Sequence, residues 1–144
     1  MKVLNLKDKS RENYNAAKLL RDNTLYRASC SRYYYAMFVK LNEICIRKLN
    51  YSHNDGANSH NNVINHYKRF MHDANYHDYG KLAKARTIAS NMITAKDYRK
   101  DADYHEEDYI DDEICDELER FHQFLLDNWS DVNQIIENNK EVLS

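Results

Sequence analysis

Apolar residues recur with a helical period along most of the chain. Tyr34, Phe38, Leu41 and Cys45 fall within roughly 60° of one another on a wheel of 3.6 residues per turn. A longer stripe of the same period lies near the C-terminus and comprises Ile114, Leu118, Phe121, Leu125, Val132 and Ile136. The chain has no proline, and its two glycines lie in the turn-rich stretches "SHNDGAN" and "NYHDYGK". The pattern predicts an all-α protein.

Five helices are expected, and short connections between them favour an antiparallel bundle. Their expected ranges are about 7–21, 24–49, 59–74, 81–104 and 111–138. The second helix is apolar around much of its circumference, so we expect it at the centre. Asp111, Asp112 and Glu113 should begin the last helix, because carboxylates there face the positive end of the helix dipole. A length of 144 residues suits a single helical domain, residues 1–144, with its own core.

Composition narrows the class of protein further. No apolar run approaches the roughly 18 residues of a membrane span, and "MKVLNLKDKS" has no signal-peptide core. We therefore expect a cytoplasmic protein without a membrane segment. Cys30, Cys45 and Cys115 are far apart and form no C-x-x-C pair, so reduced, half-buried thiols are expected rather than a disulfide framework or a zinc knuckle.

The net charge of −2 hides an uneven distribution along the chain. Residues 1–98 hold 17 Lys and Arg against 8 Asp and Glu, a net charge of +9, whereas residues 99–144 hold 4 against 15, a net charge of −11. Two interpretations follow. Oppositely charged helix faces can neutralise one another across the bundle, or the basic part can present a surface to a polyanion such as RNA.

The sequence offers no dedicated metal or phosphate site. A di-metal helical bundle needs two Glu-x-x-His pairs, and the chain has one, Glu119 with His122. The remaining histidines lack a ligand spacing such as H-x-x-x-H, and two isolated glycines cannot form a phosphate loop. We therefore expect no metal and no cofactor, and a polar, histidine-rich surface.

The stretch "DYRKDADYHEED", residues 97–108, holds the candidate chemistry. On a continuous helix Arg99 and His105 would point roughly 120° apart, whereas Arg99 and Asp103, at i and i+4, would form an ordinary surface ion pair. Arg99 and His105 can act together only if the helix breaks near Tyr104 or if two chains contribute. Because the fourth helix is expected to end there, a catalytic pair is plausible beside the ion-pair interpretation.

Two segments carry a family resemblance. "ASCSRYYYAMFVKLNEI", residues 28–44, resembles the A-x-S-R-x-Y-Y-A-M-F helix of the HEPN superfamily, the higher-eukaryote and prokaryote nucleotide-binding domain. "YRKDADY", residues 98–104, is similar to the R-x-x-A-D-Y segment of one bacterial and archaeal branch, and Ser59-His60 to the Ser/Thr-His that opens its third helix. The resemblance runs from the first helix to about residue 128.

The resemblance implies a small helical bundle that forms a homodimer. Many members of the superfamily are metal-independent ribonucleases whose R-x(4–6)-H motifs meet in one cleft between two chains, and Arg99 and His105 fit that spacing. The residue after the arginine is usually Asn, Asp or His, and here it is Lys100. Some members pair with a nucleotidyltransferase antitoxin and carry a Tyr two places after the His, where this chain has Glu107.

The residue types suit RNA cleavage by the substrate's own 2′-hydroxyl. His105 can move protons near neutral pH, and Arg99 can stabilise the phosphoryl oxygens. Asp103 is expected to orient one of them, and Tyr104 either stacks on a base or is buried with its hydroxyl bonded. Arg32 lies in an apolar helix, so we expect it to be buried with Asp103 as its partner.

Two functions from different classes remain at this point, beside a third interpretation as a structural helical bundle with no functional site. The first is a HEPN endoribonuclease, acting as a toxin or a phage-defence effector, with RNA as substrate. The second is a non-catalytic HEPN adaptor, which binds a nucleotide, RNA or a partner enzyme within a larger defence or toxin–antitoxin complex. The acidic residues around the motif favour the second, because they repel a phosphate backbone unless basic residues of a second chain cover them.

Overall fold

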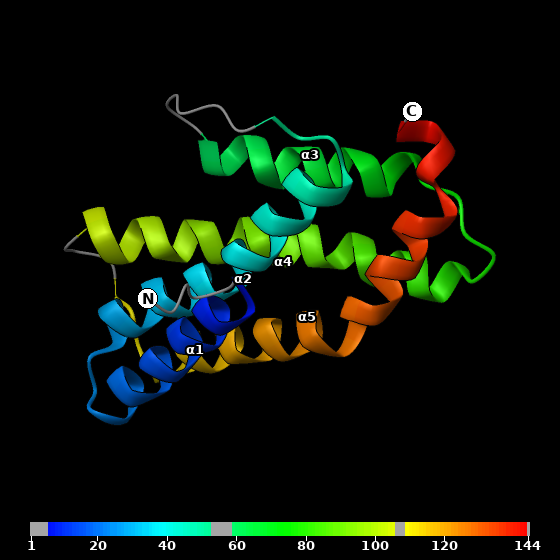
Figure 1. Cartoon of the computed structure of the whole chain (residues 1–144). Helices are drawn as coiled ribbons and strands as arrows, with labels where there is room; N and C mark the ends of the chain where they lie inside the picture. Colours follow the sequence, from blue (N-terminus) through cyan, green and yellow to red (C-terminus); the bar gives the residue numbers. More distant parts are fainter. Residues whose placement is uncertain (1–5, 53–58, 106–108, 144) are drawn as a thin grey trace.

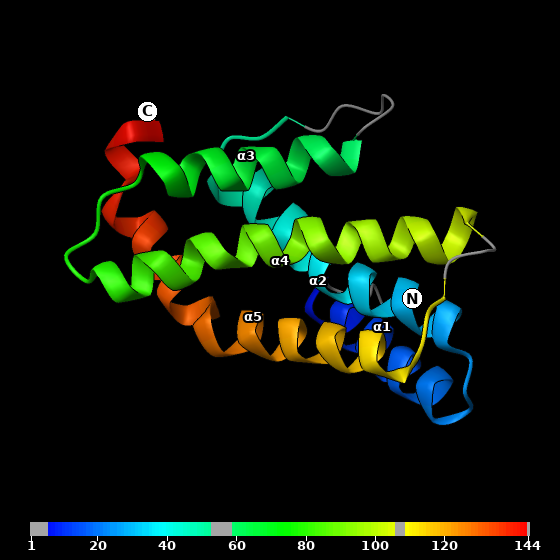
Figure 2. The ribbon, with the colours of Figure 1, turned by 180° about the vertical axis from the view of Figure 1, so that it is seen from behind.

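The computed structural model describes residues 6–52, 59–105 and 109–143, and within these the chain is an all-α bundle (Figure 1). Its helices are α1 (Leu6–Asp22), α2 (Tyr26–Lys48), α3 (Ser59–Asp73), α4 (Tyr79–Tyr104) and α5 (Asp112–Asn138), followed by the 3₁₀ turn η1 (Lys140–Leu143). Each boundary lies within two residues of the expected one, so the predicted helices are confirmed. α1 and α2 run antiparallel, as do α3 and α4, and α4 and α5 (Figure 2). α2 and α3 instead run in the same general direction, since Tyr34 contacts His60 and Leu49 contacts His66, so the expected antiparallel arrangement is wrong for this pair.

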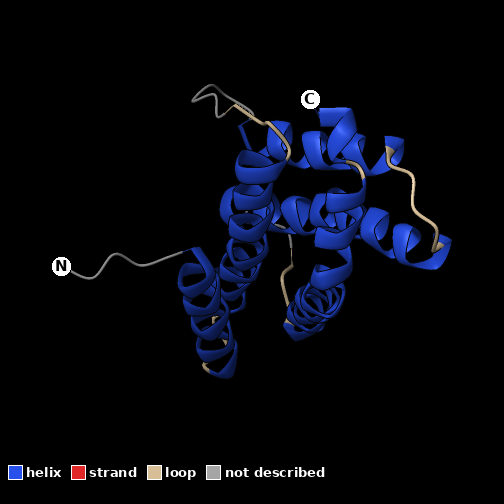
Figure 3. Cartoon of the chain, turned by 45° about the vertical axis from the view of Figure 1, so that its right-hand side comes forward, coloured by secondary structure: helices blue, strands red, loops and turns tan. Residues whose placement is uncertain are grey.

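α2 is the central helix, as its apolar circumference predicts. It packs against each of the other four α-helices, whereas α1 lies at the outside and packs mainly against α2 (Figure 3). Tyr33, Tyr34, Met37 and Leu41 of α2 are almost completely buried. Large buried side chains on several sides of one helix supply most of the hydrophobic stabilisation of such a bundle.

Small residues let α1 approach α2 closely. The hydroxyl of Ser10 donates to the carbonyl of Ala36 at 2.6 Å, and the hydroxyl of Ser29 donates to the carbonyl of Ala17 at 2.8 Å. Both serines are buried, so the two hydrogen bonds satisfy hydroxyl groups that have left water. They fix the register of the outer helix on the central one.

Aspartates begin the two longest helices. Asp78 precedes α4 and accepts from the backbone N–H of Lys81 at 3.1 Å, and Asp111 precedes α5 and accepts from the N–H of Ile114 at 3.0 Å. Each carboxylate satisfies an N–H group that has no partner inside its helix. The expected acidic start of α5 is therefore confirmed.

Oppositely charged parts of the chain meet between α1 and α5. The guanidinium of Arg21 lies 2.7 Å from a carboxylate oxygen of Asp112, 2.8 Å from Glu119 and 3.5 Å from Asp116. Here the basic and acidic parts of the sequence neutralise each other across the bundle, as the first interpretation of the charge distribution expects. The network joins the outer helix to α5.

The three cysteines are free and completely buried, rather than half-buried as expected. Burial raises the pKa of Cys30 and of Cys45 to about 12, because a thiolate is poorly solvated in the apolar interior. These thiols act as small apolar residues of the core. In the described part of the chain, no helix combines the length and apolar character of a membrane span.

Candidate active site

Arg99 is held in a fixed position on the C-terminal part of α4. Its side chain is only 18% exposed, and its Nε lies 3.0 Å from Oδ2 of Asp103. Its Nη2 donates to the hydroxyl of Tyr35 at 2.9 Å. The rings of Tyr34, Tyr35 and Tyr104 surround the guanidinium, with centroids 6.0, 5.4 and 5.9 Å from its central carbon. These contacts fix a permanent cation near the surface of the bundle.

Asp103 positions Arg99. Beside the ion pair to Arg99, its Oδ1 accepts from the hydroxyl of Ser31 on α2 at 2.8 Å. The ion pair that the i and i+4 spacing predicts is therefore confirmed. Of the two residues that Asp103 was expected to orient, the structure pairs it with Arg99. A carboxylate fixed by two partners holds its guanidinium more firmly than a solvated surface pair does.

The prediction for Arg32 is wrong. Arg32 is exposed, and its Nη1 donates to the side-chain oxygen of Asn13 on α1 at 3.2 Å. Consecutive residues of a helix point about 100° apart, so Ser31 faces α4 while Arg32 faces α1. Asp103 consequently takes Ser31 and Arg99 as its partners.

The helix breaks where the hypothesis of a catalytic pair requires it. α4 ends at Tyr104, and His105 has an extended backbone with φ −122° and ψ 91°. The guanidinium of Arg27 on α2 donates to the carbonyls of Asp101, Ala102 and His105 at 3.2, 2.9 and 3.1 Å. A cation bonded to the last carbonyls of a helix stabilises its negative end.

His105 therefore leaves the direction of α4 directly after the turns that carry Arg99. Its side chain is exposed, as a group that exchanges protons with a substrate has to be. The acidic positions 106–108 of the predicted motif, Glu106, Glu107 and Asp108, lie outside the described residues.

Tyr104 is 69% exposed, so the expectation of a buried, hydrogen-bonded tyrosine is wrong. Its ring is one of the three around Arg99. It lies on the same face of α4 as the exposed Asp97 and Lys100, so the helix directs it towards solvent rather than into the core. Stacking of Tyr104 on a base stays a prediction.

Sequence reasoning assigned no role to His60, which the fold brings to this cluster. The imidazole stacks on Phe38 with a centroid separation of 4.0 Å and an interplanar angle of 12°, and its Nδ1 is 2.8 Å from the hydroxyl of Tyr34. Burial, together with the charges of Arg99 and Lys96, lowers the pKa of His60 below its usual value. His60 is thus a neutral imidazole at neutral pH. Its only sequence signal was the Ser59-His60 similarity.

Lys96 adds a second cation one turn before Arg99. Its ammonium donates to the side-chain oxygen of Asn61 on α3 at 2.6 Å. Burial lowers the pKa of Lys96, as do the neighbouring charges of Lys100 and Arg99. Clustered cations of this kind attract an anionic group such as a phosphodiester, because binding relieves their mutual repulsion.

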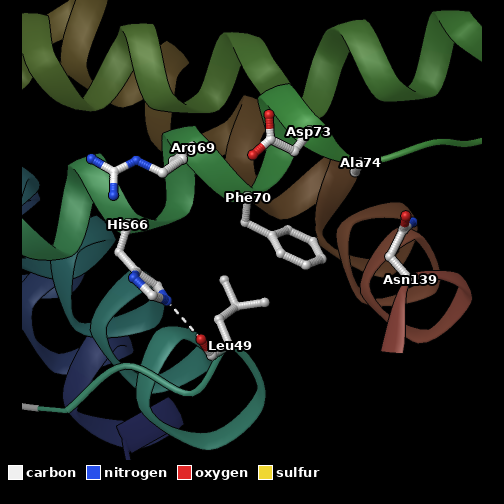
Figure 4. Close-up of a pocket in the computed structure, with 7 residues that line it drawn as sticks. All are labelled: Leu49, His66, Arg69, Phe70, Asp73, Ala74 and Asn139. Carbon is white, nitrogen blue, oxygen red and sulfur yellow. Dashed lines mark hydrogen bonds between the residues drawn. The ribbon is translucent and has the colours of Figure 1, made fainter. Parts of the chain in front are cut away.

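A pocket of about 180 Å³ lies near the N-terminal end of α4, away from Arg99, between α3 and the C-terminal ends of α2 and α5 (Figure 4). Two of its polar residues already have partners: His66 lies 2.6 Å from the carbonyl of Leu49, and the amide of Asn139 donates to Ile135 and Asn75. Small-molecule pockets usually enclose about 300 Å³ or more. Among the residues that the structure describes, no group of three or more His, Cys, Asp or Glu is placed to hold a metal ion.

Comparison with models of protein families, with curated proteins and with solved structures found no match to this chain. The all-α bundle and the residues around Arg99 therefore carry the functional argument by themselves.

Proposed function

We propose that the protein is a metal-independent endoribonuclease of the HEPN type, acting as a toxin or a phage-defence effector. The main support is that Arg99 is immobilised within a few residues of the point where the exposed His105 leaves α4. The R-x(4–6)-H spacing alone would fit many charged helices. A held cation and an exposed imidazole, six residues apart across a helix end, suit the needs of phosphodiester cleavage.

The reaction uses the 2′-hydroxyl of the RNA as nucleophile. The neutral imidazole of one His105 takes the proton of this hydroxyl while its oxygen forms a bond to the adjacent phosphorus. The bond from phosphorus to the 5′-oxygen breaks, and a second, protonated His105 gives its proton to the departing oxygen. The products are a 2′,3′-cyclic phosphate and a 5′-hydroxyl end. Arg99 stabilises the negative charge that accumulates on the phosphoryl oxygens.

A homodimer supplies the second histidine and the second arginine. One chain carries a single Arg99 and a single His105, whereas two-fold pairing brings two of each to one cleft. The cleft also needs a positive potential. Asp103 is paired with Arg99, and Lys96 and Lys100 lie on the same part of α4. Lys96 and Lys100 would therefore offset the acidic residues of the motif and attract the substrate phosphate to this part of α4.

One observation favours the second candidate, a non-catalytic adaptor that binds RNA or a nucleotide, or holds a partner such as a nucleotidyltransferase antitoxin. The guanidinium of Arg99 is already engaged by Tyr35 and Asp103 and is mostly buried. An arginine so constrained can serve to hold α4 on α2 rather than to meet a phosphate. The two functions differ in whether the isolated protein cleaves RNA.

The test is RNA cleavage by the purified protein in the presence of EDTA. We expect wild type to cleave, and we expect His105→Ala to be slower by about 10²–10⁴-fold, the usual contribution of a general acid or base. Arg99→Lys should also be slow, because lysine keeps the charge and loses the forked geometry. His72→Ala is the matched control, since this exposed histidine lies on α3 at 83% side-chain exposure.

Wild type that cleaves no RNA, with or without added divalent cations, would contradict the ribonuclease. If the same preparation binds RNA or retains a partner enzyme from the cell, the adaptor is the better account. Equal activity of wild type and His105→Ala would remove His105 from the mechanism and leave the neutral His60 beside Arg99 as the next residue to substitute.

A further inference from the structure

A pocket of about 360 Å³ lies between α1 and α2, next to the Arg99 cluster. This volume falls in the range of small-molecule pockets. Apart from the aliphatic Val39, its walls combine three kinds of side chain: cations, aromatic rings and amides. The residues concerned are Lys9, Arg32, Tyr35, Phe38, Asn13 and Asn42.

Two aromatic residues separate this pocket from Arg99. Tyr35 lines the pocket, and its hydroxyl accepts the hydrogen bond from Arg99. Phe38 lines it as well, and its ring stacks on His60 at 4.0 Å. Both rings are only partly buried, although they pack against the core. Tyr35 and Phe38 therefore form a shared aromatic wall, with the pocket on one side and Arg99 and His60 on the other.

The polar groups of the pocket are two cations and two amides. Arg32 is exposed and oriented by its bond to Asn13, and Lys9 stands on the same side of α1 as Asn13. Asn42 contributes a side-chain oxygen that is buried and makes no hydrogen bond to any described residue. A buried acceptor without a partner is costly, and a donor on a ligand would remove that cost after a small shift of the amide.

We propose that this pocket binds one nucleobase of a single-stranded RNA, immediately beside the phosphate that Arg99 holds. The base packs against Tyr35 and Phe38, an N–H group of its edge donates to Asn42, and the next phosphate lies against Arg32 and Lys9. Aromatic rings that meet bases, together with cations that follow the backbone, are the usual means of binding single strands. The inference rests on the proposed function, because it takes RNA as the ligand. It adds the position at which the nucleotide next to the cleaved phosphate is bound.

The test measures binding and needs no cleavage. A fluorescein-labelled decamer of 2′-O-methyl RNA lacks the nucleophilic hydroxyl, so its dissociation constant can be measured by fluorescence anisotropy on the active protein. We expect Phe38→Leu and Arg32→Gln each to weaken binding about five- to fiftyfold, as loss of a stacking or a phosphate contact does. Arg11→Gln should change it by less than about twofold, because this exposed arginine of α1 does not line the pocket.

Asn42→Leu separates base recognition from general attraction to RNA. 2′-O-methyl decamers of oligo(U), oligo(C) and oligo(A) should bind wild type with different dissociation constants. The ratio between these constants should be closer to one in Asn42→Leu. Arg32→Gln keeps the test decisive if Phe38→Leu fails to fold, because Arg32 is exposed and its loss leaves the core intact.

The inference and the proposed function fail separately. Wild type that binds the decamer through Phe38 and Arg32 but cleaves no natural RNA would refute the ribonuclease and support the pocket. Wild type that cleaves RNA, with Phe38→Leu and Arg32→Gln both binding as well as Arg11→Gln, would overturn the pocket alone. Absence of any binding to the decamer would also overturn it.

Discussion

His122 should make the protein lose stability as the pH falls from about 6.5 to about 4. The residue lies on α5 and is 4% exposed, and its ring stacks on Tyr14 with centroids 4.4 Å apart. Neither ring nitrogen has a hydrogen-bond partner among the described residues. Burial, and to a smaller extent the charge of Lys40, lowers the pKa of His122 to about 4.

Proton linkage gives the sign and the size of this change in the free energy of unfolding. In the unfolded chain a histidine titrates near its ordinary pKa of about 6.5, so between that pH and about 4 the unfolded state binds more protons than the folded state. The free energy of unfolding is therefore highest above pH 6.5 and falls as the pH falls towards the pKa of the folded state. The pKa change from 6.5 to about 4 corresponds to at most ~3 kcal/mol, of which about 2 kcal/mol would be lost between about pH 7 and pH 5.

The perturbation is His122→Phe, which keeps a flat ring beside Tyr14 and removes both nitrogens. Urea unfolding followed by far-ultraviolet circular dichroism gives the free energy of unfolding at about pH 7, 6 and 5. We expect the loss between pH 7 and pH 5 to be about 2 kcal/mol smaller in the variant than in wild type. The absolute stability of the variant at pH 7 depends on how well the larger ring fits, so the comparison uses only the change with pH.

His72→Gln serves as the control, because His72 is exposed at the end of α3. Its pH profile should parallel that of wild type. If His122→Phe loses as much stability on acidification as wild type does, the buried, uncharged state assigned to His122 is wrong.

Other predictions concern the helix caps and the core. Asp111→Ala should lower the free energy of unfolding by about 1 kcal/mol, measured by urea unfolding at neutral pH, because α5 loses its N-cap. Tyr67→Phe should cost about 1 kcal/mol in the same assay, since the completely buried hydroxyl donates to the carbonyl of Ala85 at 2.8 Å. All three cysteines should react with Ellman's reagent only after denaturation, and rapid labelling of the folded protein would show that the thiols are less buried than described.

The helices and the break after α4 could be predicted from the sequence because both depend on local signals. Apolar periodicity sets the helix faces, and the acidic run at Asp111 marks a helix start. The ion pair between Arg99 and Asp103 is also local, since it follows from a spacing of four residues on one helix.

The remaining contacts of the site depend on how helices pack, which periodicity does not specify. His60 reaches the aromatic rings near Arg99 only because the start of α3 packs beside α2 and α4. Arg32 was assigned to the wrong neighbour, since an apolar helix with an outer helix on one side can leave a single arginine exposed beside it. His122 entered the sequence analysis only as the partner of Glu119 in a Glu-x-x-His pair, and its burial against Tyr14 follows from the path of α1.

The most direct test of the proposed mechanism is the chemical nature of the RNA ends that the purified protein produces in EDTA. Attack by the 2′-hydroxyl predicts 2′,3′-cyclic phosphate and 5′-hydroxyl ends from wild type, and the same ends at a much lower rate from His105→Ala. It predicts no such products from an RNA with a single 2′-deoxy substitution at the cleaved position. Products with 3′-hydroxyl and 5′-phosphate ends, or undiminished cleavage by His105→Ala, would contradict it.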